Sequence, residues 1–182
     1  MTLQPGPQHR VLLIGMMGSG KSKVGRVLAD RLDWGFWDND AELERTTGED
    51  AHALMLRIGE EAMHAAESDV MLRALQLDRP TVVCCPGSIG LVMTVSDQLR
   101  EEWIVWLRAT PETLAARLAK DPHPGRPLLD DGAVAWIAEL AEARYPHYRA
   151  MADLIVDVDT LSPEAAATSI DVVRRRAVDT TD

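Results

Sequence analysis

The sequence has 182 residues, of which 46% are hydrophobic and 26% charged, and its formal net charge is −10. This length suits one compact domain and is short for two. The acidic excess argues against a general nucleic-acid or membrane-surface role, because both need a cationic face. No apolar run reaches the length of a membrane span, and residues 1–10 lack the hydrophobic stretch of a signal peptide. A cytoplasmic protein is therefore expected.

The first half of the chain alternates the patterns of buried strands and helices. Residues 11–14 form a continuous apolar run, which is typical of a strand buried on both faces. A glycine-rich segment follows at once, and residues 21–32 then show helical spacing of apolar side chains. A short strand is predicted over 35–37, before a helix for which Asp40 is the expected N-cap. Residues 50–77 are predicted to be helical, with a break at a glycine.

The second half continues the alternation. Strands are predicted over 81–84, 103–107 and 154–156, a loop over 120–132, and helices over 133–151 and from Pro111 and Ser162. Ser162-Pro163-Glu164 combines an N-cap, a proline at the first helical position and an acidic first turn. Strands that alternate with helices predict parallel βαβ units with right-handed crossovers.

Residues 15–22 satisfy the phosphate-loop pattern G-x-x-x-x-G-K-[ST]. Its glycines let the backbone aim several N–H groups at one phosphate, and the helix that follows adds its positive end. Lys21 is expected to reach the outer phosphates, and the Ser22 hydroxyl to complete the shell of a Mg²⁺ ion. A buried strand before the loop and an amphipathic helix after it make a chance match improbable. The sequence therefore predicts an ATP-binding protein, without defining the second substrate.

From residue 11 to about 175 the chain resembles the shikimate kinases, small single-domain proteins of the nucleoside-monophosphate-kinase-like group. The resemblance rests on five segments: residues 11–22 with the phosphate loop, Val24-Gly25-Arg26 with Leu28-Ala29, Asp38-Asn39-Asp40, Arg126-Pro127-Leu128-Leu129, and Arg144-Tyr145-Pro146-His147-Tyr148-Arg149. It implies an α/β fold in three layers, with a five-stranded parallel sheet in the order 2-3-1-4-5 and the phosphate loop after the central strand. It also implies one P-loop kinase domain over 1–182, with a mobile lid at about 120–132. The protein is expected to be a monomer and to act in aromatic amino acid biosynthesis.

The resemblance also assigns roles on the nucleotide side of the site. ATP and Mg²⁺ would be the cofactors. The phosphates would be bound by the loop and its neighbour, through Gly15, Gly18, Ser19, Gly20, Lys21, Ser22 and Lys23. Arg117 and Pro163 would flank the adenine ring. Arg126 would move in with the lid and neutralise charge on the transferred phosphoryl group, a role that phosphoryl transfer requires of some cation.

On the acceptor side, the resemblance implies a small-molecule substrate with a reactive hydroxyl group. Asp38 would help Ser22 to hold Mg²⁺, directly or through water. Asp40 would orient the attacking hydroxyl, and Arg144 would bind the carboxylate of the acceptor. His64 and Gly87 occupy two further positions that contact the acceptor in the family. On spacing alone, Asp38 and Asp40 fit a solvated turn equally well.

Three segments depart from the family pattern. His64 stands where the family's G-E-x-x-F-R segment has the arginine that grips the shikimate carboxylate. A histidine lacks the guanidinium fork, and losing one partner of a buried charged pair typically costs ~2–5 kcal/mol. Residues 86–88 read Pro-Gly-Ser in place of Gly-Gly-Gly, which removes an N–H and adds a side chain. Lys23 replaces the usual threonine and affects a secondary phosphate contact.

The departures at residues 64 and 86–88 fall on the acceptor side and leave two hypotheses open. One is an ATP-dependent kinase acting on a hydroxyl of shikimate or of a related cyclitol, sugar or sugar acid. The other is a shikimate-kinase-like paralogue that binds ATP in a regulatory or interaction role without efficient transfer. Asp40 and Arg126 favour the enzyme, since a binding protein does not need them. A nucleoside-monophosphate kinase fits poorly, because the chain is short and its acceptor half resembles another family.

Overall fold

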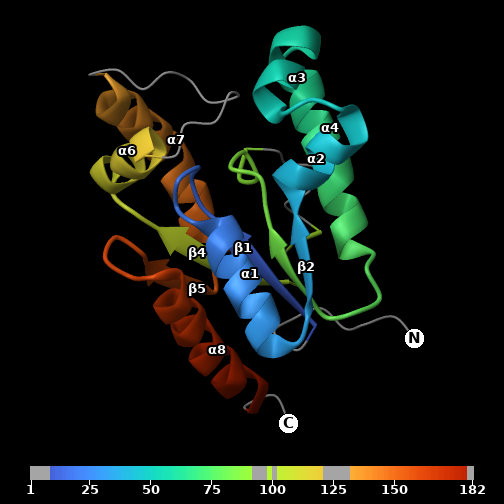
Figure 1. The fold of residues 1–182 in the computed structure, drawn as a ribbon, viewed down its shortest axis with the longest axis vertical. Coiled ribbons are helices and arrows are strands. Elements are labelled where there is room, and N and C mark those ends of the chain that lie inside the picture. Colours follow the sequence, from blue (N-terminus) through green and yellow to red (C-terminus); the bar gives the residue numbers. More distant parts are fainter. Residues whose placement is uncertain (1–8, 92–97, 100–101, 121–131, 180–182) are drawn as a thin grey trace.

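The computed structural model describes residues 9–91, 98–99, 102–120 and 132–179. Figure 1 shows the elements, which in chain order are β1 (Arg10–Ile14), α1 (Lys21–Leu32), β2 (Gly35–Asp38), α2 (Asn39–Thr47), α3 (Ala51–Ile58), α4 (Glu60–Leu75), β3 (Thr81–Cys84), β4 (Trp103–Arg108), α6 (Pro111–Lys120), α7 (Ala133–Met151), β5 (Leu154–Asp157) and α8 (Pro163–Asp179). The strands and helices predicted from the sequence all form. Among the described residues, no helix is both long enough and apolar enough to cross a membrane.

The five strands form one parallel sheet in the order β2-β3-β1-β4-β5, which confirms the predicted topology. β1 lies at the centre, paired with β3 on one side and β4 on the other, and all five of its residues are buried. Its run of β-branched and leucine side chains suits this position, because helices cover both faces of the sheet (Figure 1). The phosphate loop leaves the carboxyl end of β1, in the middle of the molecule.

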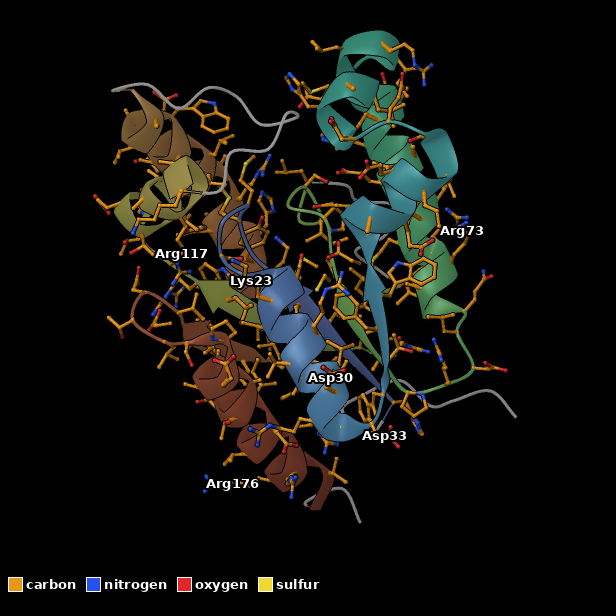
Figure 2. All side chains as sticks on the ribbon, viewed as in Figure 1. Lys23, Asp30, Asp33, Arg73, Arg117 and Arg176 are labelled. Atoms are coloured by element: carbon orange, nitrogen blue, oxygen red, sulfur yellow. The ribbon has the colours of Figure 1, made fainter. Side chains whose placement is uncertain are left out.

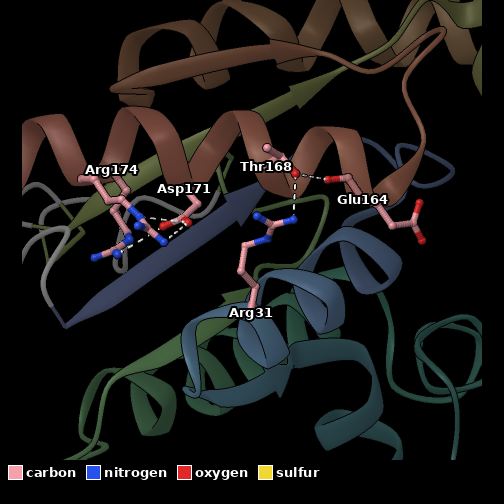
Figure 3. Close-up of polar contacts among 6 residues, drawn as sticks. Arg31, Glu164, Thr168, Asp171 and Arg174 are labelled. Carbon is pink, nitrogen blue, oxygen red and sulfur yellow. Dashed lines mark hydrogen bonds and ion pairs between the residues drawn. The ribbon is translucent and has the colours of Figure 1, made fainter.

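Helices α1 and α8 lie side by side on one face of the sheet (Figure 1). Figure 3 shows the polar contacts of this pair: the Arg31 guanidinium donates to Thr168 Oγ1 at 2.8 Å, and that hydroxyl donates to the Glu164 carbonyl at 2.7 Å. On α8 the buried Asp171 accepts a hydrogen bond from Arg174 at 3.2 Å. The last helix thereby braces the helix that carries the phosphate loop.

Two groups of helices flank the loop on its two sides. Helices α2, α3 and α4 pack on one another beside β2, and α6 packs on α7 near β4 (Figure 1). The first group has a small core of its own, formed by Leu43, Leu54, Met63 and Val70. The main core is continuous with the sheet and includes Met71 of α4 and Ile137 of α7. The groups that carry the acceptor-side residues are therefore anchored to the same sheet as the loop.

The start of α2 differs from the prediction. Asp38, and not Asp40, is the N-cap, because Asp38 Oδ1 accepts a hydrogen bond from the Asp40 backbone N–H at 3.2 Å and the helix begins at Asn39. Either aspartate has the chemistry of a cap, and the sequence does not say where the strand ends. β2 continues through Asp38, which pairs in register with Cys84 of β3, and this pairing sets the start of the helix.

Candidate functional site

The phosphate loop joins β1 to α1 through three glycines in the positive-φ region, Gly15 (148°), Gly18 (81°) and Gly20 (93°). A Cβ atom on Gly15 would lie 2.6 Å from the Leu107 carbonyl oxygen of β4, so no larger residue fits there. A backbone bond from the Ser19 N–H to the Met16 carbonyl closes the turn at 3.1 Å. The first turn of α1 carries no acidic residue, which suits an anion at the positive end of the helix.

The side chains of the loop supply a cation and two hydroxyl groups. Lys21 Nζ donates to the carbonyls of Gly15 at 2.8 Å and Met16 at 3.3 Å, and these bonds hold the ammonium group over the loop. Ser22 is exposed at the first turn of α1. Ser19 is buried, and its Oγ has no hydrogen-bond partner among the described residues. Such an orphaned group is expected where a polar ligand completes the hydrogen bonding.

Arg117 of α6 ties the phosphate loop to the segment that leads into α8. Its guanidinium donates to the carbonyls of Gly18 at 3.4 Å and Val158, and a further bond reaches Asp159 at 3.4 Å. Figure 2 places Arg117 at the same end of α1 as Lys23, whose side chain is exposed. Ser162 caps α8, and Pro163 starts it, as predicted. Arg117 therefore positions the loop and the start of α8 relative to each other.

Asp38 and Asp40 lie at the carboxyl end of β2, on the same edge of the sheet as the phosphate loop. The Asp40 side chain is exposed, and the Asp38 side chain is half-buried. Among the described residues no group of three His, Cys, Asp or Glu side chains could hold a metal ion by itself. Mg²⁺ in kinases needs only one or two protein ligands, because the phosphates and waters supply the rest. Ser22 and Asp38 fit such a site.

On the other side of the loop, Arg144 and Tyr148 of α7 meet the turn after β3. The Tyr148 hydroxyl donates to the Gly87 carbonyl, and burial raises the pKa of this phenol. Arg144 Nη1 lies so near Gly87 that a Cβ there would be 3.2 Å away. Arg144 Nε is buried and has no hydrogen-bond partner among the described residues. A guanidinium with an unpartnered N–H beside a glycine suits a carboxylate ligand.

The three unusual positions on the acceptor side are placed as follows. His64 is a half-buried residue of α4. Pro86 begins the turn after β3, where its carbonyl accepts a hydrogen bond from the Ile89 N–H at 3.2 Å. Ser88 is buried, and its hydroxyl donates to Glu67 Oε2 at 2.5 Å. The side chain that serine adds at position 88 therefore makes a specific hydrogen bond to Glu67.

Glu67 is the one site residue among these that the sequence analysis did not identify. It is only 6% exposed, and burial raises the pKa of its carboxyl group to about 7. The bond from Ser88 and the charges of Arg144 and Lys21 oppose this shift, and the charge of Asp40 adds to it. A signal was present, because Glu67 falls between Met63 and Val70 on the apolar face of α4.

The predicted site residues thus come together at one edge of the sheet, apart from Arg126 and His64. Arg126, with the rest of the predicted lid over 121–131, lies outside the described residues. The contacts of His64 with the acceptor side stay a prediction. The charges of Lys21, Asp40 and Arg144 all influence the pKa of Glu67, which is bonded to Ser88, the residue after Gly87.

Comparison with known proteins gives one family. The shikimate kinase family model matches residues 17–174. A shikimate kinase of Paramagnetospirillum magneticum is 41% identical over 158 residues, which cover 85% of this chain and 78% of that protein. A shikimate kinase of Alteromonas mediterranea is 36% identical, over 90% of this chain and 95% of the relative.

The solved structures agree with the sequence relatives. Shikimate kinase from Acinetobacter baumannii, solved in complex with shikimate, superposes with a TM-score of 0.86 and 26% sequence identity. The alignment covers 93% of this chain and 94% of that structure. The similarity therefore spans the sheet, the phosphate loop and both flanking groups of helices.

Proposed function

The chain belongs to the shikimate kinase family, ATP-dependent phosphotransferases that use Mg²⁺ and act on a hydroxyl group, and we propose that its acceptor is shikimate. The observation that carries this proposal is the position of Arg144 beside Gly87, at the same carboxyl edge of the sheet as Lys21 of the phosphate loop and Asp40 after β2. Phosphoryl transfer needs positioning and charge neutralisation, and these three side chains offer a cation for the phosphates, a carboxylate for the hydroxyl and a guanidinium for the carboxylate.

In the proposed reaction, Asp40 accepts a hydrogen bond from the attacking hydroxyl and orients it toward the γ-phosphate. Lys21 binds the outer phosphates, while Gly15, Gly18, Ser19 and Gly20 supply backbone and hydroxyl donors. Ser22 and Asp38 would hold Mg²⁺, which neutralises phosphate charge when bound. Arg144 holds the acceptor carboxylate beside Gly87 and His64. Each of these roles is consistent with the position of the side chain at the carboxyl edge of the sheet.

The remaining predictions enter the proposal unchanged. Lys23 makes a secondary phosphate contact, Arg117 and Pro163 border the adenine, and Arg126 completes the charge neutralisation from a lid at about 120–132. Residues 1–182 form one kinase domain, which acts as a monomer in the cytoplasm within aromatic amino acid biosynthesis, with no nucleic-acid or membrane partner.

An assay of ADP release over a panel of acceptors tests this function. With shikimate, quinate, gluconate, cyclitols and nucleoside monophosphates offered in turn, shikimate is expected to give the highest kcat/KM. Faster release with a nucleoside monophosphate or a neutral sugar would contradict the proposed acceptor. Mg·ATP binding without release for any acceptor would instead support the second hypothesis, a binding paralogue, which the histidine at position 64 favours.

The acceptor side also predicts the effect of restoring the guanidinium group. His64→Arg should lower the KM for shikimate by about tenfold, the factor that corresponds to ~1.4 kcal/mol, because the arginine would share the carboxylate with Arg144. His64→Gln is the matched control and should not lower it. The same change is also made together with Ser88→Gly, in case the serine blocks the new side chain. Tight shikimate binding by the wild-type protein would contradict the account, since another residue would then replace the missing arginine.

A further inference from the structure

The turn after β3 and helix α4 are joined by one buried side-chain pair, Ser88 and Glu67. Ser88 is 5% exposed and Glu67 6%, and the hydrogen bond between them is 2.5 Å long. The backbone of Glu67 is fixed as well, because its carbonyl accepts a bond from Asn39 Nδ2 at 3.3 Å. The carboxyl group therefore has a defined place and does not turn out to solvent.

Three charged groups influence this carboxyl group. The charges of Arg144 and Lys21 lower its pKa and the charge of Asp40 raises it, while Ser88 bonds it from the turn. Ser88 follows Gly87, and Arg144 Nη1 lies so close to Gly87 that a Cβ atom there would be 3.2 Å away. Two of the three charges are positive, and both are assigned to ligands in the proposed reaction. Ionised Glu67 is therefore a competitor for the cations that the acceptor carboxylate and the phosphates need.

The ionisation state of Glu67 is balanced near neutral pH. Burial is the largest influence and raises the pKa of this carboxyl group to about 7, with the Ser88 bond, Arg144 and Lys21 acting in the opposite direction and Asp40 in the same one. Below that pH the group is a neutral acid that can donate to the Ser88 oxygen. Above it the group is an anion that accepts from the Ser88 hydroxyl. Because the serine hydroxyl can serve in either direction, the pair persists in both states.

We propose that Glu67, held in place by Ser88, is a specificity-determining residue that selects the charge of the acceptor. The proposal rests on the proposed function and refines it. When Glu67 is ionised, it weakens the attraction of Arg144 for an acceptor carboxylate and repels that carboxylate directly. A neutral polyhydroxyl acceptor suffers neither effect. The chain therefore discriminates against anionic acceptors as the pH rises, and favours them as Glu67 takes up a proton.

A pair of acceptors that differ only in charge tests the proposal. Shikimate and its methyl ester share the ring and hydroxyl groups, so the ratio of their kcat/KM values cancels effects on ATP, Mg²⁺ and Asp40. The series is measured in a His64→Gln background, so that the side chain at position 64 is neutral throughout. Between pH 6 and pH 8.5 the ratio of shikimate to ester is expected to fall by about tenfold, a size set by one buried charge near another.

Two variants separate a charge effect from a structural one. Glu67→Gln is nearly isosteric and neutral at every pH, so its ratio should stay at the low-pH value of the parent throughout. Ser88→Ala removes a bond that lowers the Glu67 pKa, so the fall in the ratio should move to higher pH. Thermal unfolding measured by circular dichroism confirms that each variant is folded.

The outcomes distinguish this inference from the proposed function. If both acceptors are phosphorylated and the ratio has the same pH dependence in Glu67→Gln as in its parent, the inference is wrong and the function stands. If neither acceptor is phosphorylated by protein that binds Mg·ATP, the proposed function fails and the inference with it. A ratio that does not change with pH in the parent would also overturn the inference.

Discussion

Replacing Lys21 by alanine is expected to lower the rate of phosphoryl transfer by on the order of 10³-fold, comparable to the loss of a preorganised charge-stabilising group in other active sites. Lys21 Nζ lies over the loop, bonded to the Gly15 and Met16 carbonyls, and is the cation that the phosphate-loop pattern places against the outer phosphates. Transfer is measured by ADP release with saturating acceptor, and Mg·ATP affinity by isothermal titration calorimetry.

The matched control for this variant is Arg73→Ala. Arg73 is exposed on α4 and lies away from the phosphate loop (Figure 2). The control removes one positive charge from the same chain, so a general effect of net charge would appear in both variants. Unchanged Mg·ATP binding and transfer in Lys21→Ala would refute the assignment of the loop as the nucleotide site.

The second large effect is expected at Arg144. Arg144→Met keeps the length of the side chain and removes its charge, and it should raise the KM for shikimate by roughly a hundredfold or more, since the loss of one partner of a buried charge pair costs about 2–5 kcal/mol. The KM of Arg144→Lys should lie between those of the wild type and Arg144→Met, because an ammonium group keeps the charge without the bidentate fork. The affinity for Mg·ATP should change little in both variants.

A control and a second acceptor make this result specific. Arg149→Met alters an exposed arginine of the same helix and should leave the KM for shikimate unchanged. Shikimate methyl ester reports on structural damage, because it has no carboxylate for Arg144 to hold. If Arg144→Met loses activity on the ester as severely as on shikimate, Arg144 acts by holding Tyr148 and Gly87 in place and does not bind the carboxylate.

Local sequence identified the phosphate loop and Lys21, whereas the role of Arg144 came from the family resemblance. A phosphate loop is a local structure, since the turn, its glycines and the following helix are all set by residues close in the chain. The buried run of β1 and the alternation of strands with helices likewise defined a parallel sheet before any contact was known. The strand order came from the family resemblance, and the structure confirms it.

The acceptor side depended on packing between segments far apart in sequence. The sequence showed Ser88 only as a departure from glycine, and it showed Glu67 as one of many acidic residues. Their bond joins positions 21 residues apart and exists only because β3 brings its turn against α4. The same packing removes water from Glu67, and this burial raises the pKa of its carboxyl group to about 7. Composition and residue spacing do not predict such a shift, because it depends on tertiary burial. The start of α2 was misplaced for a similar reason, since pairing of Asp38 with β3 decided where the strand ended. Local sequence therefore determined the nucleotide side of this protein, whereas tertiary burial and pairing determined the charge and hydrogen bonding of the acceptor side.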